Sequence, residues 1–134
     1  MPTSRLSVET HAREEMIDVT AQVRRAVRES GVASGIAVCF VPHTTAAVTI
    51  NENADPDVAR DILYKLDKEI PAADGYRHAE GNSDAHVKST LVGVSAHVLI
   101  EGGDLVLGAW QGIYFCEFDG PRRRHLIVRV MSGA

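Results

Sequence analysis

Three histidines stand in polar surroundings, where neutral imidazoles could bind a divalent metal ion. His43 ends an apolar run, His78 lies in a long polar segment, and His86 follows eight positions later. Several imidazoles that converge from different segments are the usual ligands of a transition metal. A helix that begins just before His86 would disfavour its positive charge and keep it available as a ligand. The spacing leaves two interpretations open, a metal site or loop histidines that are solvated or hydrogen-bonded.

Carboxylates lie close to these histidines in the sequence. Glu80 is two positions from His78, Glu52 follows a strand-like run, and Asp61 falls on the helix after it. A carboxylate can orient a metal-bound imidazole or act as a general acid or base. The alternatives are a solvated turn residue for Glu52 and a surface ion pair with Lys65 for Asp61.

A turn at 119–124 carries three consecutive arginines after an Asp-Gly-Pro sequence. Arginine forks match phosphate oxygens, so this turn could bind a phosphorylated small molecule, although a charged hairpin turn is the alternative. Trp110 is the only tryptophan, and a core or subunit-interface position is the default expectation for it. The sequence contains no Walker A loop, Rossmann fingerprint, HExxH motif or nucleophile elbow.

The elements that must position these residues follow from the apolar pattern. Apolar residues at helical spacing predict two longer helices, over 21–30 and 56–69, and a short helix over 85–92. Thr20 and Asp55 are the expected N-caps of the two longer helices. The expected buried stripe of the second helix consists of Val58, Ile62 and Leu66.

Strands are predicted where β-branched and apolar residues form runs or alternate with polar ones. These segments are 6–10, 17–19, 36–41, 46–50, 96–100, 105–109, 113–118 and 126–130. Gly102 and Gly103 form a tight hairpin turn, and 71–83 is expected to be a loop. Strands and helices are grouped rather than strictly alternating, which indicates an α+β fold with a mainly antiparallel, sandwich-like β-sheet.

The composition limits the class of protein. A chain of 134 residues suits one domain over 1–134, and its formal net charge of −4 disfavours a general nucleic-acid binder. No apolar run is long enough for a membrane span, and the first fifteen residues lack the apolar core of a secretory signal. Cys39 and Cys116 are expected to be buried free thiols. We therefore expect a cytoplasmic protein without nucleic-acid or membrane partners.

Seven short motifs in a fixed order carry a further inference. They are HTTAA at 43–47, NENADP at 51–56, HAEGN at 78–82, HVKS at 86–89, LVG at 91–93, GAWQGI at 108–113 and EFDGPR at 117–122. In this order they resemble the motifs of the YjbQ-like family, whose members are often named secondary thiamine-phosphate synthases. One position departs from the family pattern, because Ala109 stands where a threonine is usual.

The resemblance implies an α+β domain with a sandwich-like core, a homotrimer, and polar pockets near the subunit boundaries. It implies a divalent metal ion, zinc or magnesium, held by His43, His78 and His86. It also implies a catalytic carboxylate, for which Glu52, Asp61 and Glu80 are the candidates. The substrate-binding residues that it implies are Thr44, Thr45, Asn53, Lys88, Trp110, Gln111 and Arg122.

The implied reaction joins two phosphorylated heterocycles. A hydroxymethylpyrimidine pyrophosphate loses pyrophosphate as the nitrogen of a thiazole phosphate attacks its methylene carbon. A divalent cation and Arg122 would stabilise the departing charge, while His43 and Thr44 position phosphate oxygens and Trp110 flanks the pocket. Two alternatives remain open: a metal-assisted phosphate hydrolase, and a non-catalytic trimeric module that binds a small anionic ligand or a metal.

Overall fold

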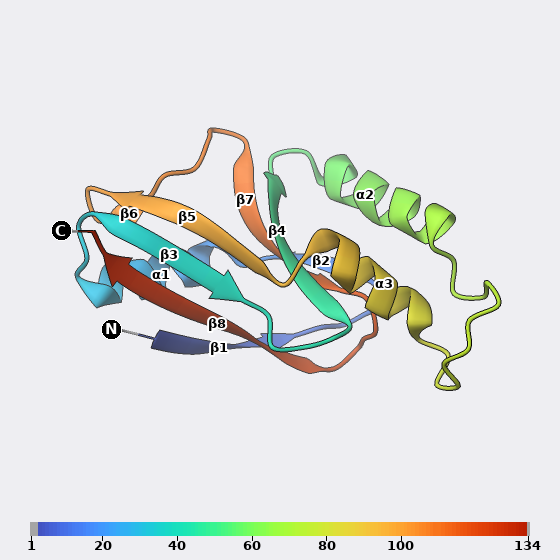
Figure 1. The fold of residues 1–134 in the computed structure, drawn as a ribbon. Helices are drawn as coiled ribbons and strands as arrows, with labels where there is room; N and C mark the ends of the chain where they lie inside the picture. The colour runs from blue at the N-terminus through green and yellow to red at the C-terminus, as the bar shows by residue number, and fades with distance from the viewer. Residues whose placement is uncertain (1–2, 134) are drawn as a thin grey trace.

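A computed structural model describes residues 3–133 of the chain (Figure 1). Within them the elements follow one another in the order β1 (Thr3–Glu9), β2 (Glu15–Asp18), α1 (Thr20–Ser30), β3 (Gly35–Phe40), β4 (Ala46–Glu52), α2 (Pro56–Glu69), α3 (Ser83–Val92), β5 (Ser95–Glu101), β6 (Asp104–Leu105), β7 (Gln111–Glu117) and β8 (Arg123–Ser132). They form one α+β domain, as the sequence predicts.

The strands form two antiparallel sheets. The first has the order β1-β8-β3-β5-β6, and the second has the order β2-β7-β4. The expected glycine turn joins β5 to β6, and both Gly102 and Gly103 have positive φ there. The antiparallel, sandwich-like sheet arrangement is therefore confirmed.

The main core lies between the two sheets. Side chains such as Val128 of the first sheet pack there with Val48 and Phe115 of the second. Helix α1 contributes Val23 and Val27 to the same core and packs on the same face of the first sheet as the second sheet does (Figure 1). The second sheet has only three strands, and α1 completes the layer that covers the first.

The second sheet is buried on both faces. Its outer face carries Ala47, Tyr114 and Cys116, which form a second cluster with Leu63 and Leu66 of α2. Successive side chains of β7 face the main core and the second cluster in turn, so all its residues after Gln111 are buried. This double burial explains why the segment is a continuous apolar run in the sequence rather than an alternating one.

Two helix starts differ from the expected ones. Thr20 is the first residue of α1 rather than its N-cap, and the side chain of Asp18 accepts hydrogen bonds from both its backbone N–H and its hydroxyl. Helix α3 begins at Ser83 and has 10 residues, so it is nearly as long as the 11-residue α1. In contrast, Asp55 caps α2 as predicted and accepts from the N–H of Asp57.

The apolar face of α2 is less deeply buried than its pattern predicts. Val58 and Ile62 are only half-buried, and no residue of α2 is fully buried. Ala59, Leu63 and Leu66 are the residues that contact the second cluster, so the contact face is rotated away from the predicted stripe. The helix covers the outside of a narrow sheet, which leaves most of its circumference in solvent.

Strand β6 is also shorter than expected, with two residues instead of the run over 105–109. After Val106 donates to Leu99 O, the chain leaves the first sheet to reach β7 in the second. Both cysteines are buried and free, and burial raises the pKa of each thiol to about 12. No helix within residues 3–133 is long and apolar enough to cross a membrane.

Helix α3 is anchored by a buried charge cluster. The ammonium of Lys88 is fully buried and lies 2.6 Å from Glu14, 3.2 Å from Asp67 and 3.4 Å from Asp84. Arg13 pairs with the other side of Asp84, at 3.0 Å. Burial alone would raise the pKa of Asp84, but the hydrogen bond and charge of Arg13, together with the charge of Lys88, lower it. The cluster ties α3 to the N-terminal strands and to α2.

We predict that Lys88→Ala lowers the free energy of unfolding by about 3 kcal/mol, because three carboxylates lose the ammonium between them and the buried Asp84 keeps only Arg13. Urea denaturation at neutral pH measures this difference. The control is Lys65→Ala, which removes an exposed lysine whose partner is Glu69 and should leave stability nearly unchanged. Equal effects of the two substitutions would contradict the anchoring role.

Candidate functional site

A polar pocket of about 540 Å³ lies where four segments meet: the β3–β4 connection, the loop before α3, the first turns of α3, and the β7–β8 turn. It is lined by Pro42, His43, Thr44, Thr45, His78, Glu80, Asn82, His86, Asp119, Arg122 and Arg124. The three histidines of the predicted metal site are therefore brought to one pocket from three separate segments.

Local structure explains why these segments converge. Pro42 follows β3 and turns the chain toward β4, which places His43 and Thr44 on the connection between the sheets. The hydroxyl of Ser89 donates to Ala46 O at 2.6 Å and holds α3 against the start of β4. The N-terminal turns of α3 then face the same pocket through His86.

The base of the pocket is a buried ion pair between Arg124 and Glu117. The Nε atom of Arg124 lies 2.9 Å from Glu117 Oε1, and its terminal nitrogen also donates to Glu117. The same nitrogen donates to the Thr45 hydroxyl at 2.8 Å, while the Thr10 hydroxyl donates to Glu117 at 2.8 Å. The pair thus joins β7, β8, the start of β4 and the end of β1.

Opposing effects act on the pKa of Glu117. Burial alone would raise it, but hydrogen bonds from Arg124, from the backbone N–H of Asp119 and from Thr10 outweigh burial and lower it. Glu117 therefore stays ionised at neutral pH and compensates the charge of Arg124. Because this charge is compensated, the guanidinium of Arg124 offers the pocket its fixed N–H donors that remain unpaired and not a net positive charge.

His43 has one of its two ring nitrogens already engaged. Its Nε2 accepts a hydrogen bond of 2.9 Å from the backbone N–H of His125, whose ring stacks on it with centroids 6.3 Å apart. Burial and the nearby charges of Arg124 and His125 lower the pKa of His43. The imidazole is therefore neutral at pH 7, with its proton on Nδ1, and it is a hydrogen-bond donor toward a ligand.

His78 and His86 lie close together on the other side of the pocket. Their ring centroids are 5.5 Å apart with perpendicular planes, and His78 Nε2 is 3.9 Å from a Glu80 oxygen. Among residues 3–133, no three histidine, cysteine or acidic side chains are grouped as metal ligands. Because Nε2 of His43 is also engaged, the predicted ligand set does not fit a metal ion as arranged. The divalent cation stays a prediction from the resemblance.

Arg122 is held at the rim of the pocket by Asp119. Its Nε donates to Asp119 O at 2.9 Å and a terminal nitrogen donates to the carboxylate at 3.0 Å, while the side chain remains half exposed. Asn82 donates to the same carboxylate at 2.9 Å, which fixes the orientation of its amide. Asn82 Oδ1 is buried and accepts no hydrogen bond, which leaves an unpaired acceptor in the wall of the pocket.

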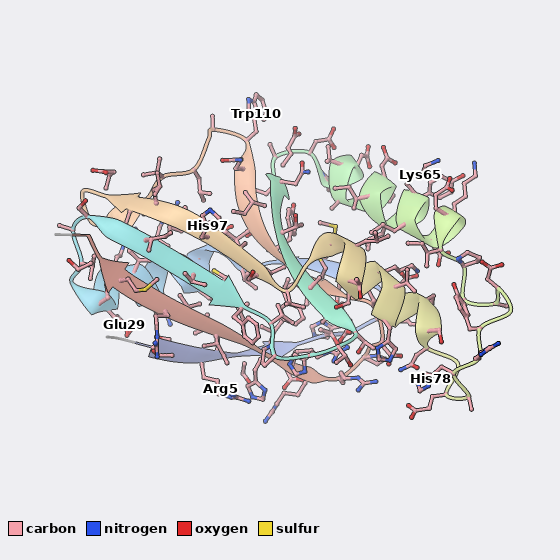
Figure 2. All side chains as sticks on the ribbon, in the orientation of Figure 1. Arg5, Glu29, Lys65, His78, His97 and Trp110 are labelled. Carbon is pink, nitrogen blue, oxygen red and sulfur yellow. The ribbon has the colours of Figure 1, made fainter. Side chains whose placement is uncertain are left out.

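Four predicted site residues lie at the opposite end of the β4–β7 pair. Glu52 pairs with Gln111 there, whereas Ala46 pairs with Glu117 next to the pocket. The two ends are six residues apart along β4, which corresponds to about 20 Å in an extended strand. Asn53 and Trp110 lie at the distant end as well, and Trp110 is 65% exposed. Figure 2 shows Trp110 at the top of the view, above β7, and His78 at the lower right, in the loop before α3.

Asp61 and Lys88 are also absent from the pocket. Asp61 is exposed on α2, and the ion pair suggested for it does not form, because Lys65 binds Glu69 instead. Lys88 is enclosed in the charge cluster that anchors α3. Of the three candidate carboxylates, only Glu80 lines the pocket, together with the predicted residues Thr44, Thr45 and Arg122.

The sequence patterns assign no role to Glu117 or Asn82, and they include Arg124 only as one of three arginines in a phosphate-binding or charged turn. For Arg124 a signal was available, since it shares one face of β8 with Leu126 and Val128, the face that is buried. A charged residue on an apolar face needs a buried partner of opposite charge. The partner was not visible, because Glu117 occupies a position in a strand whose two faces are both buried.

Comparison with known proteins assigns the fold and this arrangement of motifs to a family. Residues 4–133 match the family model described as UPF0047 protein YjbQ-like. The chain belongs to this family. The UPF0047 protein YugU of Bacillus subtilis is 53% identical over 128 residues, which cover 95% of this chain and 97% of that protein. A UPF0047 protein of Methanocaldococcus jannaschii is 53% identical over 125 residues, 93% of this chain and 91% of the relative.

Solved structures of the YjbQ-like family have the same fold. A family protein of Clostridium acetobutylicum superposes with a TM-score of 0.94 at 55% identity, over 96% of this chain and 99% of that one. A protein of Sulfolobus solfataricus, described as of unknown function, gives a TM-score of 0.95 at 33% identity, over 98% and 97% of the two chains. These likenesses establish the family and the fold.

We predict that Glu117→Gln lowers the free energy of unfolding by about 3 kcal/mol, because the guanidinium of Arg124 loses its buried counter-charge. The lowered pKa of Glu117 stabilises the fold above the ordinary carboxyl range, and this stabilisation is lost as the pH falls through the lowered value. Urea denaturation between pH 3 and pH 7 should therefore show a shallower acid decline in the variant. Glu9→Gln is the matched control, since its partner Arg123 is exposed.

NMR of labelled histidine tests the state of His43. We expect the Nδ1–H tautomer at neutral pH and a pKa below the ordinary value of about 6.5, because burial and nearby positive charge disfavour the imidazolium. Long-range proton–nitrogen correlation spectra recorded across a pH titration distinguish the tautomers. An Nε2–H tautomer, or a pKa above the ordinary value, would contradict the geometry at His125.

Proposed function

We propose that the polar pocket binds the phosphate groups of a small substrate and catalyses the loss of pyrophosphate from it. The observation that carries this proposal is the convergence of His43, His78 and His86 with Arg122 in one pocket. Imidazole N–H groups and a guanidinium are strong donors to phosphate oxygens. Asn82, the N-cap of α3, makes no capping hydrogen bond, so the first N–H groups of the helix add to the attraction for an anion.

The reaction is the one implied by the name that members of the family often carry, secondary thiamine-phosphate synthase. The nitrogen of a thiazole phosphate attacks the methylene carbon of a hydroxymethylpyrimidine pyrophosphate. A carbon–nitrogen bond forms, the carbon–oxygen bond breaks, and pyrophosphate leaves with the electron pair of that bond. The nitrogen carries no proton to lose and becomes positively charged, so the protein's main task is to stabilise the leaving group.

Each pocket residue has a separate role in stabilising the leaving pyrophosphate. His43 donates through Nδ1, and the Thr44 hydroxyl lies next to it for a second phosphate oxygen. Arg122 binds the outer phosphate from the rim, where Asp119 holds its guanidinium plane. His86 and His78 lie opposite, where their imidazole N–H groups would donate hydrogen bonds to the departing pyrophosphate. No step here depends on a metal ion.

A second candidate reaction uses the same pocket. Glu80 lies near His78 on the open side of the site, where a carboxylate and an imidazole could activate a water molecule. Phosphate-ester hydrolysis would then release phosphate without the thiazole substrate. A non-catalytic module would bind the anion but release neither product. Assays of pyrophosphate and of phosphate release, each with and without the thiazole phosphate, separate all three.

We also propose that the protein assembles as a homotrimer, as the resemblance implies. The support is the outer face of the first sheet, which no element within residues 3–133 covers. Ile36, Val38 and Phe40 of β3 lie there beside Leu99 of β5 and Ile127 of β8, all exposed or half-buried. An apolar face of this kind is typical of an interface between copies.

We predict that Arg122→Ala weakens pyrophosphate binding about 10- to 100-fold, because it removes a charged donor to the phosphate. Isothermal titration calorimetry measures the affinity, and the rate of pyrophosphate release should fall with it. Arg123→Ala is the control, since this neighbouring arginine points to Glu9 outside the pocket. Unchanged affinity in Arg122→Ala would remove its clamp role, and wild-type protein without pyrophosphate affinity would refute the proposed function.

Sedimentation velocity tests the assembly. We expect wild-type protein to sediment at three times the chain mass and Leu99→Lys to sediment at the mass of one chain, because a charge on this apolar face is costly to bury. Tyr64→Lys, which places the same charge on the exposed side of α2, is the control. A wild-type monomer, or a Leu99→Lys trimer, would contradict association through this face.

A further inference from the structure

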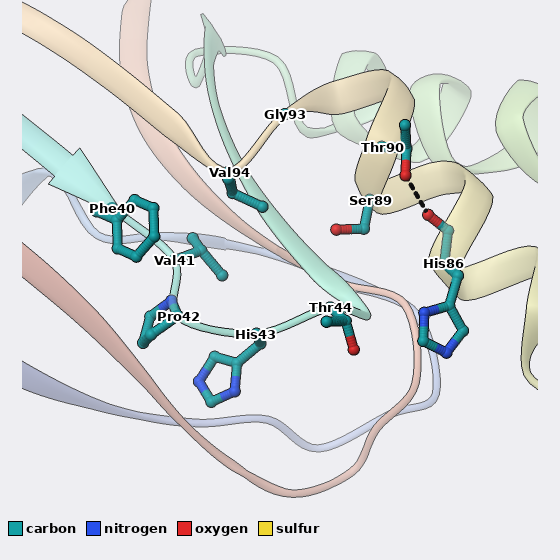
Figure 3. A pocket seen from close by; sticks show the side chains of 10 residues that line it. All are labelled: Phe40, Val41, Pro42, His43, Thr44, His86, Ser89, Thr90, Gly93 and Val94. Atoms are coloured by element: carbon teal, nitrogen blue, oxygen red, sulfur yellow. Dashed lines mark hydrogen bonds between the residues drawn. The ribbon is translucent and has the colours of Figure 1, made fainter.

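A second cavity adjoins the polar pocket. It has a volume of about 600 Å³, within the range of small-molecule sites. It is lined by Phe40, Val41, Pro42, His43, Thr44, His86, Ser89, Thr90, Gly93 and Val94 (Figure 3). It lies between the end of β3 and the C-terminal half of α3, and of the predicted site residues only His43, Thr44 and His86 reach it.

The two spaces share one wall. Pro42, His43, Thr44 and His86 line both of them. Figure 3 shows His43 and His86 on opposite sides of the opening, with Thr44 between them. A ligand whose phosphate lies between these histidines can therefore extend directly into the second cavity.

The chemistry of the second cavity differs from that of the polar pocket. Phe40, Val41, Pro42 and Val94 form an apolar side, and the cavity has no acidic or arginine side chain. The hydroxyls on the α3 side are already engaged, since Ser89 donates to Ala46 O and Thr90 donates to His86 O. A polyhydroxylated group would find few partners there, whereas a flat apolar ring would cover the 43% exposed Phe40.

We propose that the second cavity is a subsite for the organic part of the substrate, and that this part is a flat aromatic or heteroaromatic ring. The site would then select ring phosphates over sugar phosphates and over free phosphate. This inference rests on the proposed phosphate-binding function of the adjoining pocket. It adds Phe40 as the residue that determines specificity for the ring.

Calorimetry with three probes tests the subsite: inorganic phosphate, glycerol phosphate and phenyl phosphate. Burying one aromatic ring tightens binding about 10- to 100-fold, so phenyl phosphate should bind at least about 10-fold more tightly than glycerol phosphate. Phe40→Ala should remove most of this gain and leave the affinity for inorganic phosphate unchanged. The control is Leu99→Ala, which truncates an apolar residue of the same sheet face outside both cavities and should keep the gain.

Two results would overturn the subsite. One is equal affinity for phenyl and glycerol phosphate in the wild type. The other is loss of the tighter binding of phenyl phosphate in both Phe40→Ala and Leu99→Ala. That result would assign the tighter binding to contacts between copies of the chain, and sedimentation of each variant would check whether those contacts are lost.

Failure of the proposed function gives a different result. In that case inorganic phosphate does not bind, but the amide NMR signals of Gly93 and Val94 still shift when benzyl alcohol, a neutral ring, is added. If benzyl alcohol and phenyl phosphate both leave these signals unchanged, the ring subsite is refuted independently of phosphate binding.

Discussion

The ion pair between Arg124 and Glu117 is buried where β7, β8 and the start of β4 come together. Neither charge is tolerable there alone, so the pair forces the ends of both sheets to meet with their hydrogen bonds satisfied. Thr45 and Thr10 complete the set of partners. The pocket exists because this junction holds the β3–β4 connection and the β7–β8 turn against each other.

Helix α3 supplies the remaining wall, and it is anchored from the opposite side by the charge cluster around Lys88. The helix therefore presents His86 to the pocket from a fixed position between two buried electrostatic networks. The engagement of Nε2 of His43 has a comparable effect, because it determines which ring nitrogen carries the proton. Both constraints favour a site whose donors are already oriented before an anion arrives.

The residues of the family motifs do not all lie at one site within a single chain. His43, Thr44, Glu80 and Arg122 gather in the pocket, whereas Trp110 and its neighbours lie about 20 Å away at the other end of the β4–β7 pair. Antiparallel pairing accounts for the separation, since it places the end of β4 beside the beginning of β7. The pocket is adjoined instead by a second cavity, where motif residues such as His43 and His86 lie beside apolar side chains.

The sequence alone determined the α+β class, the antiparallel strands, the cap of α2 and the histidine candidates, because these depend on local periodicity and on residue type. Only the tertiary structure decided that Arg124 pairs with Glu117 and that Lys88 is enclosed by carboxylates. It also decided that Glu52 and Trp110 lie far from the histidines. Those outcomes depend on pairing between segments distant in the chain, and the partner that a buried charge will find is not encoded in its own neighbourhood.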